Sequence, residues 1–122
     1  MLFKPYHVDL VLDEIKTETR RFFLSVKTGR VYKARTDYTA NYFAKILILK
    51  IWRERLLDIS QESVLAEGCQ TKEEYIKVFR KINKSNKEDN PMVWAIKFKL
   101  IESNISHKKK NSLFDWFEPQ KR

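Results

Sequence analysis

The run from Phe43 to Arg55 constrains the fold more than any other part of the chain. It is dense in isoleucine and leucine, includes a tryptophan, and contains neither glycine nor proline. Such a run is typical of a long, curved strand that is buried on one face and partly buried on the other. A helix over the same residues is the alternative. We therefore expect a sheet at the centre of the fold.

Other segments have the patterns of strands. Val93 to Ile101 alternates apolar with polar residues, which predicts a strand with one buried face. Lys16 to Ser25 favours a loop that enters a strand. Lys27 to Arg30, which contains a glycine, predicts a hairpin turn, and Val31 to Asp37 would be the returning strand.

Helical signals lie between these segments. The apolar spacing over residues 6–14 predicts a short helix. Ser60 is placed to cap a helix that Gly68 ends, and Thr71 with Glu74 forms a capping box for another. The order helix, strands, long strand, helices, strand defines an α+β class. The number of strands in so short a chain suggests a closed or nearly closed β-barrel.

The chain is basic, and the excess charge is concentrated early in the sequence. Its 122 residues fit one domain, and 25 Lys and Arg against 16 Asp and Glu give a net charge of +9. This charge favours a polyanionic partner such as nucleic acid; a merely soluble basic surface is the plainer interpretation. The basic residues between positions 16 and 35 are Lys16, Arg20, Arg21, Lys27, Arg30, Lys33 and Arg35, against the single acid Glu18.

Some function classes are excluded by what the sequence lacks. Cys69 is the only cysteine, so the chain cannot form an internal disulfide. The sequence has no CxxC motif or His-rich cluster to hold a metal, and nothing in it calls for a cofactor. It shows no long apolar segment at the start and no uninterrupted apolar stretch of membrane-spanning length. We therefore expect a cytoplasmic protein.

The pattern K-x-x-T-x-R at Lys16, Thr19 and Arg21 is the candidate site. In an extended segment this spacing places Thr19 and Arg21 on one face, with Lys16 nearby. An ammonium, a hydroxyl and a guanidinium together can bind an anion. A lysine of lowered pKa can also take the proton of the threonine hydroxyl and make it a nucleophile for acyl transfer. Solvated surface charges are the plainer alternative.

The segment from Glu14 to Arg21 resembles the signature of the ASCH family, G-x-K-x-x-[ST]-x-R, with Glu14 in place of the glycine. Blocks at residues 53–60, 66–68, 71–75 and 90–98 are similar to later blocks of the family and follow in the same order. The resemblance covers about residues 2–102. Residues 22–42 have no clear match to the family.

This resemblance implies a PUA-like small β-barrel with helices at the rim, formed by an ASCH-like domain over residues 1–102. It also implies a cleft suited to RNA or nucleosides. From the basic segment, we expect Arg20, Arg21, Lys33 and Arg35 to bind such a ligand. Some bacterial relatives look like amidohydrolases that deacetylate N4-acetylcytidine. By that likeness Thr19 would be the nucleophile, Lys16 the proton acceptor and Glu67 the proton donor.

Residues 103–122 differ from the rest and predict a tail. Lys110 to Phe117 is similar to the motif by which replication and repair proteins bind a sliding clamp, with Leu113, Trp116 and Phe117 at matching positions. Lys110 stands where that motif usually has glutamine. A latch that folds back on the domain is the alternative.

Three hypotheses of function therefore stand: a module that binds RNA or another nucleic acid, an amidohydrolase acting on an acylated nucleoside, and an adaptor that works through its tail. Trp52 and Trp94 fit a packed core better than a platform for stacked bases, because each lies in an apolar run.

Overall fold

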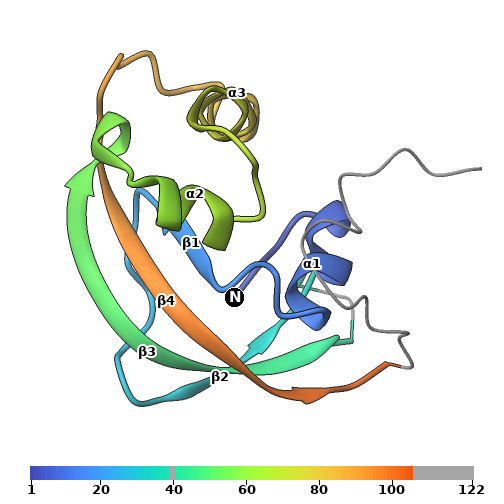
Figure 1. The fold of residues 1–122 in the computed structure, drawn as a ribbon. Helices are drawn as coiled ribbons and strands as arrows, with labels where there is room; N and C mark the ends of the chain where they lie inside the picture. Colours follow the sequence, from blue (N-terminus) through green and yellow to red (C-terminus); the bar gives the residue numbers. More distant parts are fainter. Residues whose placement is uncertain (39–40, 106–122) are drawn as a thin grey trace, which may run out of the picture.

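A curled antiparallel sheet forms the centre of the structure, a computed structural model that describes residues 1–38 and 41–105. The four strands lie in the order β1-β4-β3-β2, and the sheet curves into a half-barrel (Figure 1). The strands are β1 (Glu18–Arg21), β2 (Val31–Ala34), β3 (Ala44–Arg55) and β4 (Met92–Ser103). The predicted α+β class with a barrel-like sheet is confirmed.

The two long strands β3 and β4 set the curvature. They pair along their whole length, from Ala44 opposite Ser103 to Arg55 opposite Met92. The register shifts twice, between Lys45 and Ile46 and between Ile48 and Lys50. Bulges of this kind bend a strand and increase its twist. The long, curved strand predicted for residues 43–55 is therefore confirmed, and a helix there is excluded.

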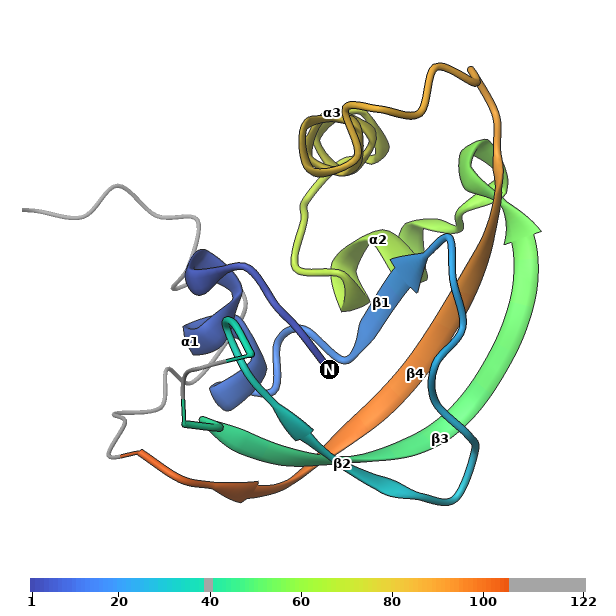
Figure 2. The ribbon, with the colours of Figure 1, turned by 180° about the vertical axis from the view of Figure 1, so that it is seen from behind.

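The predicted hairpin between residues 16–25 and 31–37 is wrong. β1 pairs with β4 and β2 pairs with β3, so the two strands occupy opposite edges of the sheet. Figure 2 shows their connection running from one edge to the other. A turn does form around Gly29, whose φ is 82°, but it is held by β3: Gly29 N donates to the carbonyl of Ile48, and Ile48 N donates to that of Arg30. The barrel is consequently open between β1 and β2.

Helices stand at both sides of the hollow of the sheet, α1 on one side and α2 with α3 on the other (Figure 1). The 3-10 and α-helices are η1 (Pro5–His7), α1 (Val8–Leu12), η2 (Leu56–Asp58), α2 (Gln61–Ala66) and α3 (Lys72–Ile82). Ser60 Oγ accepts a hydrogen bond from Ser63 N, and Thr71 Oγ1 accepts one from Glu74 N, as predicted. The Glu74 carboxylate reaches Gln70 N, one residue before the cap.

Two apolar cores pack the helices against the sheet. One lines the inner face of the sheet and takes Val11 and Leu12 from α1; the other joins α2, α3 and the start of β4. Trp52 and Trp94, predicted for the core, are instead half-buried. Each lies under a cation: Lys50 Nζ is 5.0 Å from the centroid of the Trp52 ring, and Arg53 Cζ is 4.9 Å from that of Trp94.

Glu14, which stands at the glycine position of the ASCH signature, has a φ of 59°. This is the left-handed region that glycine favours and that costs other residues free energy. The backbone at Glu14 therefore has a conformation that glycine would adopt readily, although the residue is a glutamate.

Leu113, Trp116 and Phe117, the residues of the predicted clamp motif, lie outside the described residues. The adaptor hypothesis therefore stays a prediction. Within the described ranges, no helix combines the length and the apolar character that crossing a membrane requires.

Candidate functional site

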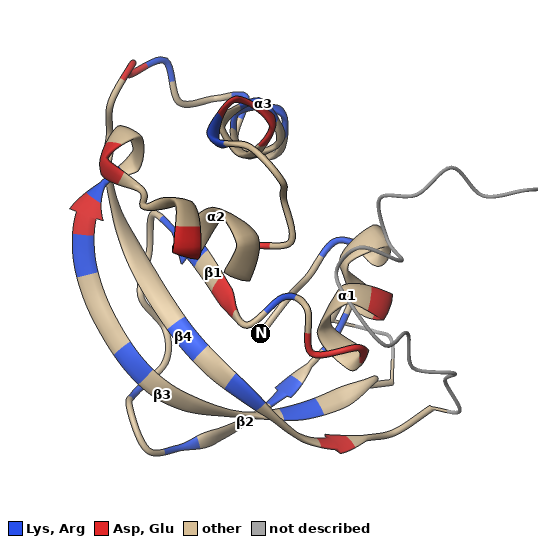
Figure 3. Ribbon diagram, in the orientation of Figure 1, with Lys and Arg blue, Asp and Glu red and all other residues tan. Residues whose placement is uncertain are grey.

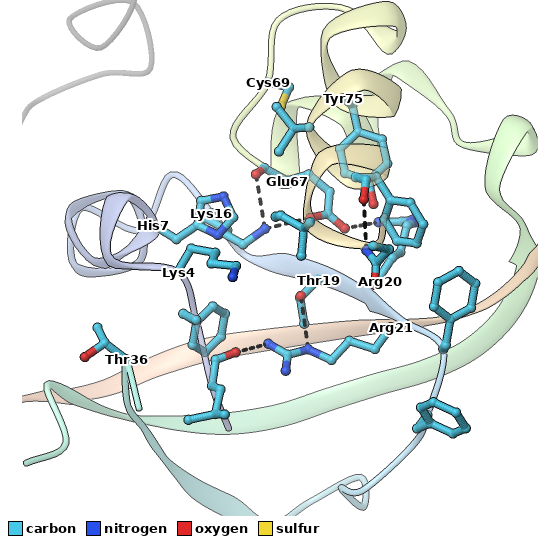
Figure 4. Close-up of a pocket in the computed structure, with 18 of the residues that line it drawn as sticks. Lys4, His7, Lys16, Thr19, Arg20, Arg21, Thr36, Glu67, Cys69 and Tyr75 are labelled. Atoms are coloured by element: carbon cyan, nitrogen blue, oxygen red, sulfur yellow. Dashed lines mark hydrogen bonds and ion pairs between the residues drawn. The ribbon is translucent and has the colours of Figure 1, made fainter. Parts of the chain in front are cut away.

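A pocket opens in the gap between the two free edges of the sheet. It is a cavity of about 530 Å³. On the β1 side it is lined by Thr19 and Arg21, and on the β2 side by Leu2 and Thr36. The end of α2 and one face of α3 close it on a third side. Figure 4 shows the polar side chains converging on this space.

Glu67, directly after α2, is the centre of a buried ion network at one end of the pocket. Lys16 Nζ lies 2.6 Å from Glu67 Oε1 and donates a further hydrogen bond of 3.2 Å to the Glu67 carbonyl. Arg20 Nη1 lies 2.9 Å from Glu67 Oε2. The side chains of Lys16 and Glu67 are each only 3% exposed. Both carboxylate oxygens are therefore held by cations.

Arg20, in β1, extends the network to two more carboxylates. Its Nη1 lies 3.0 Å from Glu18 Oε1, and its Nε and Nη2 lie 2.8 and 2.6 Å from Glu54 Oε1 in β3. The side chain of Arg20 is fully buried. Burial alone would lower the pKa of Arg20, but the charge of Glu67 and hydrogen bonds to Glu67 and Glu54 raise it above its ordinary value. With Lys16 and Arg20 as cations and three carboxylates as anions, the network has a net charge of −1.

Thr19 and Arg21 lie on either side of Arg20 in β1, and both line the pocket. Arg21 Nε lies 3.4 Å from Thr19 Oγ1, and its Nη2 donates to the Leu2 carbonyl. Its Cζ lies 5.2 Å from the centre of the Phe3 ring. Leu2 in turn pairs in parallel with Arg35, just after β2. Arg21 thus connects the two edges of the half-barrel, and burial lowers the pKa of its guanidinium.

Three pocket residues were missed by the sequence interpretation. Burial and the positive charges of Lys16, Arg21 and Lys4 lower the pKa of His7 to about 3, so its imidazole is neutral at pH 7. Burial and the charge of Glu67 raise the pKa of Tyr75, which remains a phenol. No pattern in the sequence marks either residue, because each reaches the pocket through the packing of distant segments.

The third missed residue, Cys69, also lines the pocket. Burial, with the nearby charge of Glu74, raises the pKa of its thiol to about 11. Because the thiolate is the nucleophilic form, a cysteine in this environment is a structural thiol. In the described part of the chain, no three His, Cys, Asp or Glu side chains come together as metal ligands do.

The structure gathers most of the predicted site residues but not all of them. Lys16, Thr19, Arg20, Arg21 and Glu67 all line the pocket. Lys33 and Arg35 lie elsewhere, beside the ring of Tyr42: Lys33 Nζ is 5.1 Å and Arg35 Cζ is 5.9 Å from its centroid.

The curled sheet, with helices on both sides of its hollow, gives the chain the fold of the ASCH domain. It is similar to the ASCH domain of Lactobacillus crispatus JV V101, with 16% identity and a TM-score of 0.61 over 82% of this chain and 76% of that one. It is also similar to protein EF3133 of Enterococcus faecalis V583, of family DUF984, with 18% identity and a TM-score of 0.65 over 79% and 67% of the two chains. No family model and no curated protein matches the sequence.

Glu67 can be tested as the centre of the network by replacing it with its neutral isostere. Glu67→Gln leaves Lys16 and Arg20 buried beside an uncharged amide, and breaking a buried pair by removing one partner costs about 3–5 kcal/mol. We expect urea unfolding to show a loss of that order. Glu62→Gln, at an exposed position of α2, is the control and should change stability by less than about 0.5 kcal/mol. Equal effects from the two variants would contradict the assignment.

Proposed function

We propose that the pocket binds a nucleoside, either free or as an unpaired nucleotide of RNA. The observation that carries this proposal is a cavity of about 530 Å³ with polar groups at one end and aromatic walls, among them Phe3, Phe22 and Phe79. Small-molecule sites usually have volumes of about 300–1,000 Å³, apolar walls and a few polar groups that fix the orientation of the ligand.

The charge of the polar end favours a base over a phosphate. Lys16 and Arg20 are already compensated by carboxylates, so they are poor candidates for an anion site. What the pocket offers is a mixture of donors and acceptors: the hydroxyl of Thr19, the guanidinium of Arg21 and the neutral imidazole of His7. The edge of a nucleobase presents the same mixture. The net charge of +9 and the resemblance to the ASCH family also favour a ligand from nucleic acid.

Binding can be measured by calorimetry with cytidine and N4-acetylcytidine. Thr19→Ala removes a hydroxyl from the polar end and leaves Arg21 Nε without its acceptor, so we expect the affinity for the nucleoside to fall about tenfold. Thr28→Ala, in the exposed turn before β2, is the matched control and should bind as the wild type does. The proposal fails if neither nucleoside binds the wild-type protein, or if both variants behave alike.

A second candidate function is hydrolysis of the amide bond of an acylated nucleoside such as N4-acetylcytidine. It is favoured by the distance of 2.6 Å between Lys16 Nζ and Glu67 Oε1, with Thr19 facing the same space (Figure 4). A proton that shifts from the Lys16 ammonium to Glu67 leaves a neutral amine and a carboxylic acid. These are the proton acceptor and the proton donor that such a reaction needs.

In this reaction Thr19 Oγ1 would attack the acyl carbon while Lys16 takes its proton. The bond between the acyl carbon and N4 breaks, and Glu67 protonates the departing amine. The products of this step are cytidine and an acyl ester on Thr19. Water then hydrolyses the ester and releases acetate, and Arg21 would stabilise the charge on the acyl oxygen. No cofactor is required.

Turnover of N4-acetylcytidine, followed as release of cytidine, tests this second candidate. We expect activity in the wild type, retained activity in Thr19→Ser, and loss of activity in Thr19→Ala and Lys16→Ala proteins whose fold survives. If the wild type binds the nucleoside but does not turn it over, hydrolysis is rejected for this substrate and the binding proposal stands.

A further inference from the structure

The outer face of the sheet carries a group of lysines that the pocket does not use. They come from three adjacent strands, and Figure 3 shows basic positions on each of β2, β3 and β4. We call this group the outer lysine face; it consists of Lys33 in β2, Lys45 and Lys50 in β3, and Lys97 and Lys99 in β4. All except the half-buried Lys45 are exposed. None of them lines the pocket.

The strand register shows that these lysines share one face. Lys33 lies directly opposite Lys45, and Lys50 lies directly opposite Lys97. Residues directly opposite each other in an antiparallel pair project to the same side of the sheet. Lys99 is two residues beyond Lys97 in the same strand, so it projects to the same side as well. Their sequence neighbours Ala44, Ile96 and Phe98 are buried on the inner face.

In this arrangement two pairs of lysines, Lys33 with Lys45 and Lys50 with Lys97, lie directly opposite each other on neighbouring strands. Like charges directly opposite each other destabilise a sheet. Three acids share the face, and all give limited relief. Glu102 lies 3.9 Å from Lys45. Glu18, opposite Lys97, and Glu54, in the same strand as Lys50, are both bound to Arg20. The outer face therefore keeps an excess of positive charge at a cost to the stability of the fold.

Aromatic rings hold some of these ammonium groups in place. Lys33 Nζ and Lys45 Nζ lie 5.1 and 5.7 Å from the centroid of the same ring, that of Tyr42. Lys50 Nζ lies 5.0 Å from the centroid of the Trp52 ring. Cation–π contacts of this kind restrict the movement of a lysine and keep its charge at the surface. They also cover the ring faces, so the face offers charges to a ligand more than it offers stacking surfaces.

We propose that the outer lysine face binds the phosphate backbone of single-stranded RNA and so forms a second contact surface, separate from the pocket. Lysine acts as a point charge that suits phosphate without reading sequence. Strands about 4.8 Å apart place the ammonium groups in rows across which a flexible strand can lie. The choice of RNA over another polyanion rests on the proposed function, because a pocket for an unpaired base requires a strand with unpaired bases.

The test compares two matched double variants by fluorescence anisotropy with a labelled single-stranded RNA over a series of salt concentrations. Lys50→Gln/Lys97→Gln removes two charges from the outer face. We expect a loss of affinity of about tenfold at low salt and a decrease of about 1–2 in the salt slope. Lys77→Gln/Lys81→Gln removes two exposed charges from α3 and should bind within about twofold of the wild type. Equal losses in both variants, or no loss in the first, would overturn the proposal.

A second pair and a melting curve separate binding from folding. Lys50→Gln/Lys97→Gln relieves a like-charge contact, so its melting temperature should equal or exceed that of the wild type. Lys33→Gln/Lys99→Gln removes charge from another part of the same face and should weaken RNA binding in the same way. Stronger binding to anionic lipid vesicles than to RNA, lost in the same variants, would assign the face to a membrane surface and overturn the choice of RNA.

The proposals for the pocket and for the outer face can fail separately. Calorimetry with cytidine reports on the pocket alone, and Lys50→Gln/Lys97→Gln should leave that affinity unchanged. If the nucleoside does not bind but the RNA affinity responds to the outer lysines, the outer face stands and the pocket proposal falls. If the nucleoside binds and the RNA affinity does not respond to the outer lysines, the pocket proposal stands and the proposal for the outer face falls.

Discussion

The shape of the pocket depends on the contacts that the Glu67 carboxylate makes with Lys16 and Arg20. Lys16 follows α1, Arg20 lies in β1 and Glu67 follows α2, and Arg20 also binds Glu54 in β3. The Glu67 carboxylate therefore joins the end of α2 to the segment of Lys16 and Arg20, and Arg20 links that segment to β3. Buried ion pairs are expensive because both charges lose their hydration, and apolar residues of similar size often stabilise a protein at least as well. A network retained at this position is better explained by what it holds in place than by stability alone.

What the network holds in place is the opening of the half-barrel. β1 has only four residues and pairs with β4 alone, so its other edge is free. Arg20 anchors this strand through the buried charges, which leaves the alternate positions Thr19 and Arg21 directed at the pocket. Arg21 then reaches Leu2, which is paired with Arg35 beyond β2. The gap between β1 and β2 is therefore a cavity lined by side chains, and contacts of Arg20 and Arg21 fix both of its edges.

Local signals predicted the elements well and their partners poorly. The apolar run of β3, the caps at Ser60 and Thr71 and the alternation of β4 depend on neighbouring residues, and the structure has them where they were predicted. The turn predicted at Gly29 is also present in the structure. A turn signal does not say which strand the chain will meet next, however, and here the turn is bonded to β3 rather than to β1.

The candidate site shows the same limit. Thr19 and Arg21 share a face of one strand, so their spacing was enough to group them. The position of Glu67, 51 residues after Lys16, came from the resemblance to the ASCH family and not from any local pattern. Two of the acids that neutralise Arg20, Glu54 and Glu67, have no local signal either, since they lie 34 and 47 residues away from it. The sequence therefore overstated the free positive charge of this region, and Lys33 and Arg35 were grouped with a pocket that they do not line.

We infer that the pair of Lys16 and Glu67 holds the pocket in the shape that the ligand needs, and that the fold itself can form without the pair. The most direct test is the affinity of the double variant Lys16→Met/Glu67→Leu for N4-acetylcytidine, measured by calorimetry on protein that still unfolds cooperatively. Arg20 keeps Glu18 and Glu54 in this variant, and apolar replacement of a buried ion pair is often neutral. We expect a folded protein whose affinity is reduced about tenfold or more. A folded double variant that binds the nucleoside as tightly as the wild type would contradict this inference.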